Sequence, residues 1–240
     1  MTYYDYHPQT GSLDGKKAMT PSKGLFGTLT VRILSRLTLA VILAVVAMFV
    51  FIKLAHEVNE GETHQIDEVT IAYFRTHSHP LFFSMMKTVS WLAGNICQTV
   101  VLLGCVIYFA ATNRFRPQGV TMLLGGVGGM GLIIGLKYLF HRPRPSIIFE
   151  HLGYSFPSGH SFFAVVVYGM LTYWLTQNMS VRRRRWVWGL AVTGVFLVGF
   201  SRVLIGEHYP SDVVAGFLIA LPWVWGCLAI GAELRPGNTK

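Results

Sequence analysis

The chain has 240 residues, of which 52% are hydrophobic and only 13% are charged. Ordinary soluble domains carry about 25% charged residues, so this composition excludes a typical water-soluble domain and favours a protein embedded in a membrane. The formal net charge of +9 would also suit a nucleic-acid partner. Its densest block, Arg182 to Arg185, fits a short loop beside anionic lipid headgroups, so we expect no nucleic-acid binding.

Residues 1–30 are polar, with Gly, Pro, Ser and Lys interspersed, and they lack helical periodicity. They predict a flexible cytoplasmic tail. The rest of the sequence predicts one domain over residues 31–232, followed by a short cytoplasmic tail at 233–240.

Six apolar runs in this domain approach the length of about 17 to 25 residues that an α-helix needs to cross a membrane. The first run is flanked by Arg32, Arg36 and Lys53 and has no small-residue cleavage site after it, so it predicts a retained helix rather than a signal peptide. We therefore expect an all-α fold, a bundle of six transmembrane helices. The runs are 37–54, 96–112, 119–140, 161–176, 186–206 and 213–232.

A longer segment at about 56–94 separates the first two runs, and its apolar residues recur at helical spacing. This pattern predicts an amphipathic element along the membrane interface. The segment also contains histidines and carboxylates whose spacing matches no compact metal-ligand motif, so we interpret them as solvated and expect no metal. These residues are His56, Glu57, Glu60, Glu62, His64, Asp67, Glu68, His77 and His79.

The third run contains the sequence GGVGGMGLIIG, in which two pairs of glycines are spaced four residues apart. The pairs are Gly125 with Gly129 and Gly131 with Gly135. Small residues one helical turn apart let membrane helices approach closely, so both pairs predict tight helix packing and imply no cofactor.

The distribution of Lys and Arg predicts the orientation, because short cytoplasmic loops are enriched in them. Of the 20 such residues, 13 fall on the side of both termini when the six runs alternate in direction. We therefore expect both termini in the cytoplasm and the opposite loops on the outer face of the cell (inner) membrane.

Three groups of polar residues lie at the outer ends of these runs, where charges near lipid often mark a functional site. The first is KYLFHRPRP, in which Lys137 is followed after six residues by Arg144-Pro145. The second is PSGH, residues 157–160, at the start of the fourth run. The third is Ser201-Arg202 with the residues that follow it. The predicted topology puts all three groups on one face of the membrane.

The PSGH stretch has two explanations. Proline suits the first helical position and Ser158 suits a cap, so a plain helix start accounts for most of it. A helix N-terminus also presents N–H groups without partners and a positive dipole end, and Gly159 lets a ligand approach the backbone. The second explanation, a phosphate site, also gives His160 a purpose.

The third group continues from Ser201-Arg202 through five residues to His208 and through three more to Asp212. Pro210 interrupts the helix between His208 and Asp212, so these two side chains would pair across a turn. A carboxylate in that place would fix the histidine tautomer and raise its basicity.

With these blocks in place, the chain resembles the type 2 phosphatidic acid phosphatase superfamily, whose pattern is K-x6-RP, then PSGH, then SR-x5-H-x3-D. All three blocks are present with unbroken spacing. The resemblance covers roughly residues 37–232 and leaves the first 30 residues outside it.

The resemblance implies a metal-independent phosphatase without a cofactor. His208, oriented by Asp212, would be the nucleophile and would form a phosphohistidine. His160 would protonate the leaving oxygen and then activate water. The groups implied to bind the phosphoryl oxygens are Lys137, Arg144, Arg202 and the backbone N–H groups near Ser158 and Gly159.

The function implied by the resemblance is hydrolysis of a lipid phosphate or diphosphate, such as undecaprenyl diphosphate, phosphatidylglycerophosphate or phosphatidic acid. One alternative is a phosphotransferase that uses the same site and passes the phosphoryl group to another lipid. A second alternative is a carrier or flippase that binds a phosphate headgroup without cleaving it. The superfamily also contains soluble vanadium haloperoxidases, which six apolar runs argue against. The sequence leaves the oligomeric state open.

Four further polar residues lie near the three blocks but outside the pattern. They could tune the recognition of the headgroup, but we interpret them as solvated loop residues. They are His141, Arg142, His151 and Glu207.

Overall fold

The computed structural model of the protein describes residues 23–92, 94–112, 115–145 and 153–234. Within those ranges the chain is helical and has no β-strand, which confirms the all-α prediction. Residues 1–22 and 235–240 of the predicted tails, and His151, lie outside the described residues. The helices are α1 (Lys23–Asn59), α2 (His64–His77), α3 (Pro80–Leu92), α4 (Asn95–Ala111), α5 (Val120–Leu123), α6 (Gly129–Phe140), α7 (Gly159–Phe163), α8 (Met170–Leu175), α9 (Val181–Leu204) and α10 (Pro210–Glu233), with π-helical segments η1 (Phe115–Gly119), η2 (Leu124–Gly128) and η4 (Ala164–Gly169).

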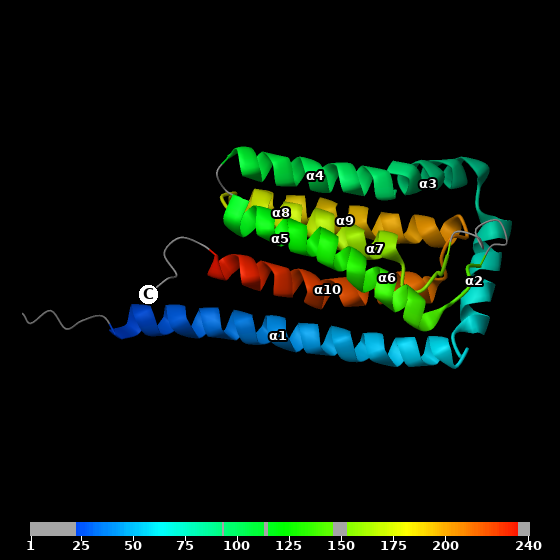
Figure 1. Cartoon of the computed structure of the whole chain (residues 1–240), viewed down its shortest axis with the longest axis horizontal. Helices are drawn as coiled ribbons and strands as arrows, with labels where there is room; N and C mark the ends of the chain where they lie inside the picture. Colours follow the sequence, from blue (N-terminus) through cyan, green and yellow to red (C-terminus); the bar gives the residue numbers. More distant parts are fainter. Residues whose placement is uncertain (1–22, 93, 113–114, 146–152, 235–240) are drawn as a thin grey trace, which may run out of the picture. The chain divides into compact units, whose positions relative to one another are not determined.

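The chain divides into two compact units, Met1–Leu39 and Ala40–Lys240. The described part of the first unit is the beginning of α1, which starts at Lys23, inside the predicted tail. All candidate site residues belong to the second unit. Within that unit the longer helices run alongside one another, and α2 lies across their ends, close to the loops that follow α6 and α9 (Figure 1).

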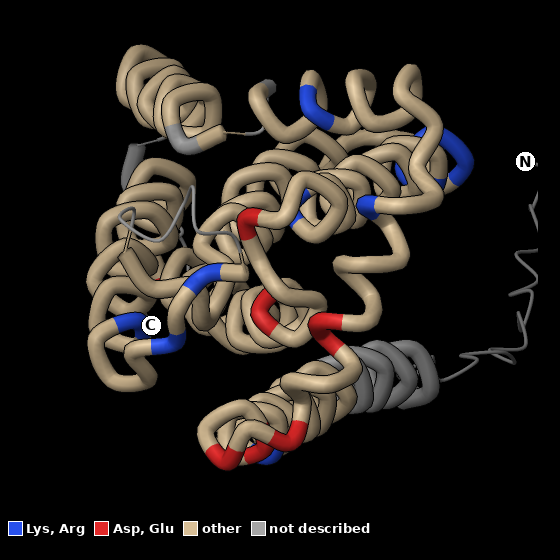
Figure 2. The backbone as a smooth tube through the Cα atoms, turned by 90° about the vertical axis from the view of Figure 1, so that its right-hand side faces the viewer, with Lys and Arg blue, Asp and Glu red and all other residues tan. Residues whose placement is uncertain are grey.

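Five helical stretches are long and apolar enough to cross a membrane, and charged positions are sparse along the helices (Figure 2). The predicted fourth run instead forms a shorter apolar helix, Gly159–Leu175, so length and composition support five spans in the described ranges rather than six. Two of the five also overlap the outer segment expected over residues 56–94, Thr38–Asn59 at its start and Pro80–Ala111 at its end. The five stretches are Thr38–Asn59, Pro80–Ala111, Pro117–Phe140, Val181–Leu204 and Pro210–Glu233.

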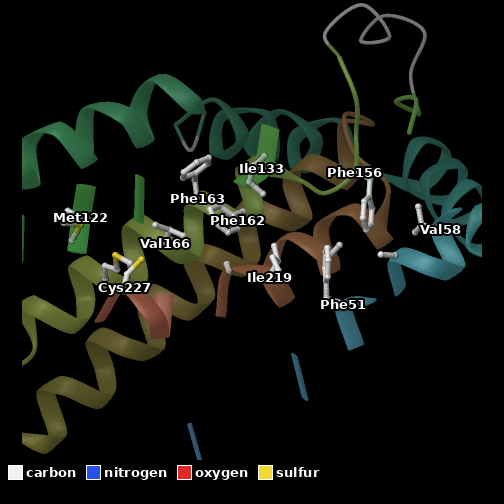
Figure 3. Close-up of a cluster of buried hydrophobic side chains, with 14 of the residues drawn as sticks. Phe51, Val58, Met122, Ile133, Phe156, Phe162, Phe163, Val166, Ile219 and Cys227 are labelled. Atoms are coloured by element: carbon white, nitrogen blue, oxygen red, sulfur yellow. The ribbon is translucent and has the colours of Figure 1, made fainter. Parts of the chain in front are cut away.

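The core of the second unit gathers around the short apolar helix that begins with α7. Phe162 and Val166 of this helix are fully buried among side chains from α5, α6 and α10 (Figure 3). Phe156, in the loop before α7, is also fully buried, and its ring centroid lies 4.9 Å from that of Phe140 and 6.1 Å from that of Phe51. Because this aromatic packing holds the loop against α6 and α1, Phe156 positions the adjacent PSGH segment.

The glycines of the third run pack closely against other helices in one of the two predicted pairs. A Cβ at Gly125 would lie 2.8 Å from Met170 Cε, and one at Gly129 would lie 2.7 Å from Phe162 Cε1. A Cβ at Gly131 or Gly135 would have no atom of the described residues within 4 Å. The predicted packing role is therefore confirmed for the first pair and wrong for the second, whose glycines face open space.

Helix α10 approaches the start of α7 through Gly216. A Cβ at this position would lie 2.5 Å from the Ser158 carbonyl oxygen and 3.0 Å from Ser161 Cβ. A backbone carbonyl cannot move aside as the end of a flexible side chain can. Glycine is therefore the residue that lets the two helices meet at this distance.

We predict that Gly216→Ala lowers the stability of the fold, because overpacking a close contact costs about 1–3 kcal/mol. Gly226→Ala is the matched control on the same helix. A Cβ there meets no described atom within 4 Å, and alanine favours a helix over glycine by about 1 kcal/mol. The measurement is the midpoint of thermal unfolding in detergent micelles, and equal midpoints for the two variants would contradict the packing argument.

Candidate active site

Helix α7 begins at Gly159, and Ser158 caps it, while Pro157 precedes the cap rather than occupying the first helical position. Ser158 Oγ accepts hydrogen bonds from Ser161 N (3.4 Å) and Ser161 Oγ (3.1 Å). Ser158 N donates to the Asp212 carbonyl oxygen at 3.0 Å, which joins the start of α7 to α10. The first turn of a helix leaves N–H groups without intrahelical partners, so this end of α7 can bind an anion.

Lys137 and Arg144 are fixed beside this helix start by backbone carbonyls. Lys137 Nζ donates to the Tyr154 carbonyl oxygen. Arg144 Nε donates to the Gly153 carbonyl oxygen at 3.2 Å, and its Nη1 donates to the Glu207 carbonyl oxygen at 3.0 Å. Burial lowers the pKa of Arg144 from its ordinary value, but a guanidinium stays protonated in proteins. Both side chains therefore place a positive charge near the N-terminal end of α7.

His208 and Asp212 are buried side by side at the start of α10. Pro210 is the first residue of this helix, and the Asp212 carboxylate in its first turn accepts a hydrogen bond from Tyr209 N at 2.9 Å. His208 Nδ1 lies 3.5 Å from Asp212 Oδ2, and the described residues provide it with no hydrogen bond. The two side chains thus face each other across the turn at Pro210. Because Nδ1 faces Asp212, Nε2 is the ring nitrogen left for a ligand.

The environment of His208 keeps its imidazole neutral. Burial lowers the pKa of His208 well below its ordinary value, and three nearby cations lower it further. At neutral pH the ring therefore carries one proton, and with that proton on Nδ1 the lone pair of Nε2 is free for nucleophilic attack. The three cations are Arg144, Lys137 and Arg202.

A cavity of about 130 Å³ lies where these groups meet. At about 30 Å³ for each water molecule, it has room for a tetrahedral phosphate. The ring centroids of His160 and His208 lie 6.1 Å apart. The cavity is lined by Met130, Ile133, Ile134, Lys137, Arg144, Gly159, His160, Phe163 and His208.

His160 also lines a second, larger cavity of about 770 Å³. Aromatic and aliphatic side chains, including Phe83, Trp91 and Ile205, form much of its wall. Since His160 belongs to both cavities, it lies between a small space with positive charges and a larger, mainly apolar space that Lys87, Arg202 and Glu207 also line.

Arg202 lines the larger cavity rather than the smaller one. Its Nη1 donates to the Glu207 carboxylate, and its Nη2 donates to the Ser90 carbonyl oxygen at 2.6 Å. Glu207 was interpreted as solvated, but its side chain is only 17% exposed and is paired with Arg202. That interpretation is wrong for Glu207, because a buried guanidinium beside it requires a counter-charge.

Two further residues that were interpreted as solvated, Arg142 and Asp67, are buried beside Asp212. Arg142 forms ion pairs with both carboxylates. Burial opposes its charge, but Asp212 and Asp67 outweigh that effect and raise the pKa of Arg142. The solvated interpretation is therefore wrong for both residues, although it holds for the exposed His141. No local pattern marks Arg142, because its partners lie 75 and 70 residues away in the sequence.

The predicted site residues thus gather at one end of the second unit. Those lining the smaller cavity are Lys137, Arg144, Gly159, His160 and His208. Ser158 and Asp212 are completely buried and do not line the smaller cavity. Ser158 caps α7, and the Asp212 carboxylate lies beside His208. Arg202 lies on the adjoining larger cavity. Fold and site together define a helical protein with several helices apolar enough to cross a membrane and a cavity lined by two cations and two histidines.

Comparison with known proteins places this arrangement in a family. Residues 117–236, half of the chain, match the family model of the PAP2 superfamily, and every predicted site residue lies in that stretch. The chain therefore belongs to the PAP2 superfamily, which confirms the resemblance carried by the three sequence blocks.

Two curated relatives and one solved structure agree with this assignment. Phosphatidylglycerophosphatase B of Bacillus subtilis (strain 168) is 28% identical over 185 residues, which cover 73% of this chain and 89% of the relative. The undecaprenyl-diphosphatase of Sulfolobus acidocaldarius is 32% identical over 122 residues, which cover 47% of this chain and 54% of the relative. The crystal structure of a transmembrane PAP2 type phosphatidylglycerolphosphate phosphatase from Bacillus subtilis matches with a TM-score of 0.70 and 25% identity, over 81% of this chain and 98% of that one.

The lowered pKa of His208 predicts how stability depends on pH. Below the ordinary value of 6.5, His208 binds a proton in the unfolded chain but not in the folded protein, so acid favours unfolding. The contribution of neutral, buried His208 to the free energy of unfolding is thus fully present above about pH 6.5 and is lost as the pH falls below that value. We expect the unfolding midpoint to drop less between about pH 7.5 and about pH 5 in His208→Gln than in the parent protein. Parallel pH dependence in the two proteins would show that His208 is not held neutral.

Proposed function

We propose that this chain, a lipid phosphatase by family, hydrolyses a lipid phosphate or diphosphate through a phosphohistidine on His208 and without a metal ion. The observation that carries the proposal is the meeting of His208, His160 and two fixed cations around one cavity of phosphate size. Phosphoryl transfer requires charge stabilisation on the equatorial oxygens, which fixed cations and helix N–H groups can supply.

In the first step, Lys137, Arg144 and the N–H groups at the start of α7 bind the oxygens of the phosphoryl group. His208 Nε2 attacks phosphorus, so that a P–N bond forms as the P–O bond to the lipid breaks. Asp212 accepts the Nδ1 proton in a hydrogen bond and stabilises the positive charge that develops on the ring. The negative charge of the phosphate stabilises the protonated form of His160, which then gives its proton to the leaving oxygen.

In the second step, His160 acts as a base. It takes a proton from a water molecule whose oxygen attacks phosphorus, and the P–N bond breaks. Inorganic phosphate leaves, His208 returns to the neutral state, and His160 is again protonated. The same side chain can perform both proton transfers because the water attacks from the side that the lipid has left.

The lipid chain fits the larger cavity. The leaving oxygen must lie within reach of His160, and His160 is the histidine that lines both cavities. The rest of the leaving group therefore extends into the apolar space of about 770 Å³ beside Phe83 and Trp91. Candidate substrates are undecaprenyl diphosphate, phosphatidylglycerophosphate and phosphatidic acid, and the first two correspond to the names of relatives.

We also propose six spans, both termini in the cytoplasm and the site at the outer face of the cell membrane. The helix Gly159–Leu175 is at the lower limit of about 17 residues for a span, and it would be the sixth. The basic block Arg182–Arg185 lies at the opposite end of α9 from Arg202. Basic residues favour the cytoplasmic side, so the site end would face outward.

The predicted activity is release of inorganic phosphate by the purified protein in mixed micelles containing EDTA, compared across the three lipids. His208→Ala should reduce release by about 10³-fold or more, because removal of a nucleophile stops the covalent route. His56→Ala, at an exposed position of α1, is the control and should retain full activity. Vanadate should inhibit, since it mimics pentacoordinate phosphorus. Strong inhibition by EDTA would reject the metal-free mechanism.

The same assay, together with a measurement of lipid movement across vesicle membranes, separates the alternatives. Release that depends on an added acceptor lipid would identify a phosphotransferase. Lipid movement that persists in His208→Ala, with no phosphate released by the parent, would identify a carrier.

The proposed orientation predicts the behaviour of reporters fused after the C-terminal residue, Lys240, in a Gram-negative host. A green fluorescent protein should be fluorescent there. An alkaline phosphatase should be inactive, because its disulfides form in the periplasm and not in the cytoplasm. The opposite pattern would place the C-terminus, and with it the site, on the other side from that proposed.

A further inference from the structure

The two carboxylate oxygens of Asp212 have different partners. Oδ2 accepts a hydrogen bond from Tyr209 N at 2.9 Å and lies 3.5 Å from His208 Nδ1. Oδ1 accepts a hydrogen bond from Arg142 Nη1 at 2.7 Å. The carboxylate is therefore held at both oxygens. Tyr209 N binds Oδ2, the oxygen that faces the histidine, and Arg142 binds Oδ1, which fixes the rotation of the group.

The guanidinium of Arg142 is in turn fixed by α2 and α10. Its Nη2 donates to Asp67 Oδ2 at 2.7 Å, and its Nη1 also donates to Ser211 Oγ at 2.7 Å. Its Cζ lies 4.1 Å from the centroid of the Tyr209 ring. Asp67 Oδ1 accepts a hydrogen bond from Ser211 N at 3.1 Å, so Asp67 also binds the first turn of α10. A planar guanidinium presents its donors in fixed directions, and the contacts on two of its nitrogens therefore determine where it points.

The charges of this cluster explain why a second carboxylate is present. Asp67, Arg142 and Asp212 expose only 2%, 9% and 0% of their surface, so each charge needs a partner. Arg142 with Asp212 alone would form a neutral pair, and the cation would cancel the attraction of Asp212 for the imidazole. With Asp67 included, the cluster keeps one net negative charge next to His208 while Arg142 still orients the carboxylate.

We propose that Arg142 and Asp67 are positioning residues for the nucleophile: Arg142 aims the Asp212 carboxylate at His208, and Asp67 both holds Arg142 in place and offsets its charge. This role rests on the proposed function of His208. Neither residue lines the cavity in which the phosphoryl group would bind. Their removal should therefore slow formation of the phosphohistidine and leave substrate binding nearly unchanged.

The first test compares Asp67→Asn with Glu68→Gln. Each variant removes one carboxylate charge from neighbouring positions of α2, but Glu68 accepts its hydrogen bond from Tyr209 Oη and lies outside the cluster. We expect Asp67→Asn to lower kcat by about 10- to 100-fold, as loss of a supporting partner typically does, with KM within about twofold of the parent value. Glu68→Gln should keep kcat within about twofold.

The measurements are phosphate release in micelles of each of the three lipids and rapid-quench detection of the phosphohistidine. The unfolding midpoint of every variant is recorded, so that kcat refers to folded protein. A normal rate of phosphohistidine formation in folded Asp67→Asn, or an equal loss of kcat in Glu68→Gln, would overturn the proposal. The cluster would then serve only to attach α2 to α10.

A second comparison uses Arg142→Lys, Arg142→Met and the double variant Asp67→Asn/Arg142→Met. Arg142→Met leaves two buried carboxylates without their cation, whereas the double variant leaves only that of Asp212. The double variant should therefore be the more stable of the two and should fold even where Arg142→Met alone does not. If Asp67 acts through Arg142, the kcat of the double variant should be no lower than that of Arg142→Met. If Arg142→Met does not fold, the kcat of the double variant should be no more than about 100-fold below that of the parent. Arg142→Lys keeps the charge without the planar fork and should fall between the parent and the double variant.

Additive losses from the two positions would contradict the proposal, because Asp67 would then act without Arg142. Parent protein that releases no phosphate, or His208→Ala that releases it normally, would instead reject the proposed function and with it the role of the cluster. Including both proteins in the same assay keeps the two failures distinct.

Discussion

The hydrogen bond from Ser158 N to the Asp212 carbonyl oxygen is the contact on which the site depends. It joins the residue that caps α7 to the residue whose carboxylate faces His208, the proposed nucleophile, so the start of α7 and the histidine before α10 keep a fixed relation. The absence of a side chain at Gly216 allows this contact, since any Cβ there would collide with the Ser158 carbonyl. Buried Phe156 holds the same loop from the other side. The close packing at Gly216 and the placement of His208 beside the start of α7 therefore depend on the same backbone contact.

The electrostatics of the site follow from placing this junction at the edge of an apolar bundle. Positive side chains and a helix N-terminus gather around the smaller cavity without a carboxylate among its lining residues. In surroundings of low dielectric constant such a group binds an anion strongly. Burial, reinforced by these charges, lowers the pKa of His208 and keeps the ring neutral, which is the state that the proposed nucleophile requires. The negative cluster of Asp67, Arg142 and Asp212 reaches the ring at Nδ1, while the ring also lines the cavity that holds Lys137 and Arg144, so His208 contacts both a positive and a negative region.

Contacts between neighbours in the sequence could be predicted, and contacts between distant residues could not. The cap at Ser158 and the turn between His208 and Asp212 follow from residue types a few positions apart. In the sequence, Arg142 cannot be distinguished from other cations of polar loops. Only the fold shows that α2 packs beside it and that Asp67 Oδ2 lies 2.7 Å from Arg142 Nη2. Likewise, Gly131 and Gly135 have the same spacing as Gly125 and Gly129, but only Gly125 and Gly129 lie on a face that another helix covers. Hydropathy predicts an apolar run at 161–176, but it does not reveal that the helix there, Gly159–Leu175, is shorter than the other five and contributes Phe162 and Val166 to the core.

The position of His160 between the two cavities also determines what can distinguish one substrate from another. In the proposed mechanism the smaller cavity contacts the phosphoryl group, which is common to every lipid phosphate, and so it would not select among them. Selection must come from the larger cavity, where the leaving group would lie beside Phe83 and Trp91. After the lipid departs, the same space decides what reaches the phosphohistidine. A water molecule there gives hydrolysis, whereas a lipid hydroxyl held next to His160 would accept the phosphoryl group. Under the proposed mechanism, substrate choice and the choice between hydrolysis and transfer are thus properties of the larger cavity, while the chemistry belongs to the smaller one.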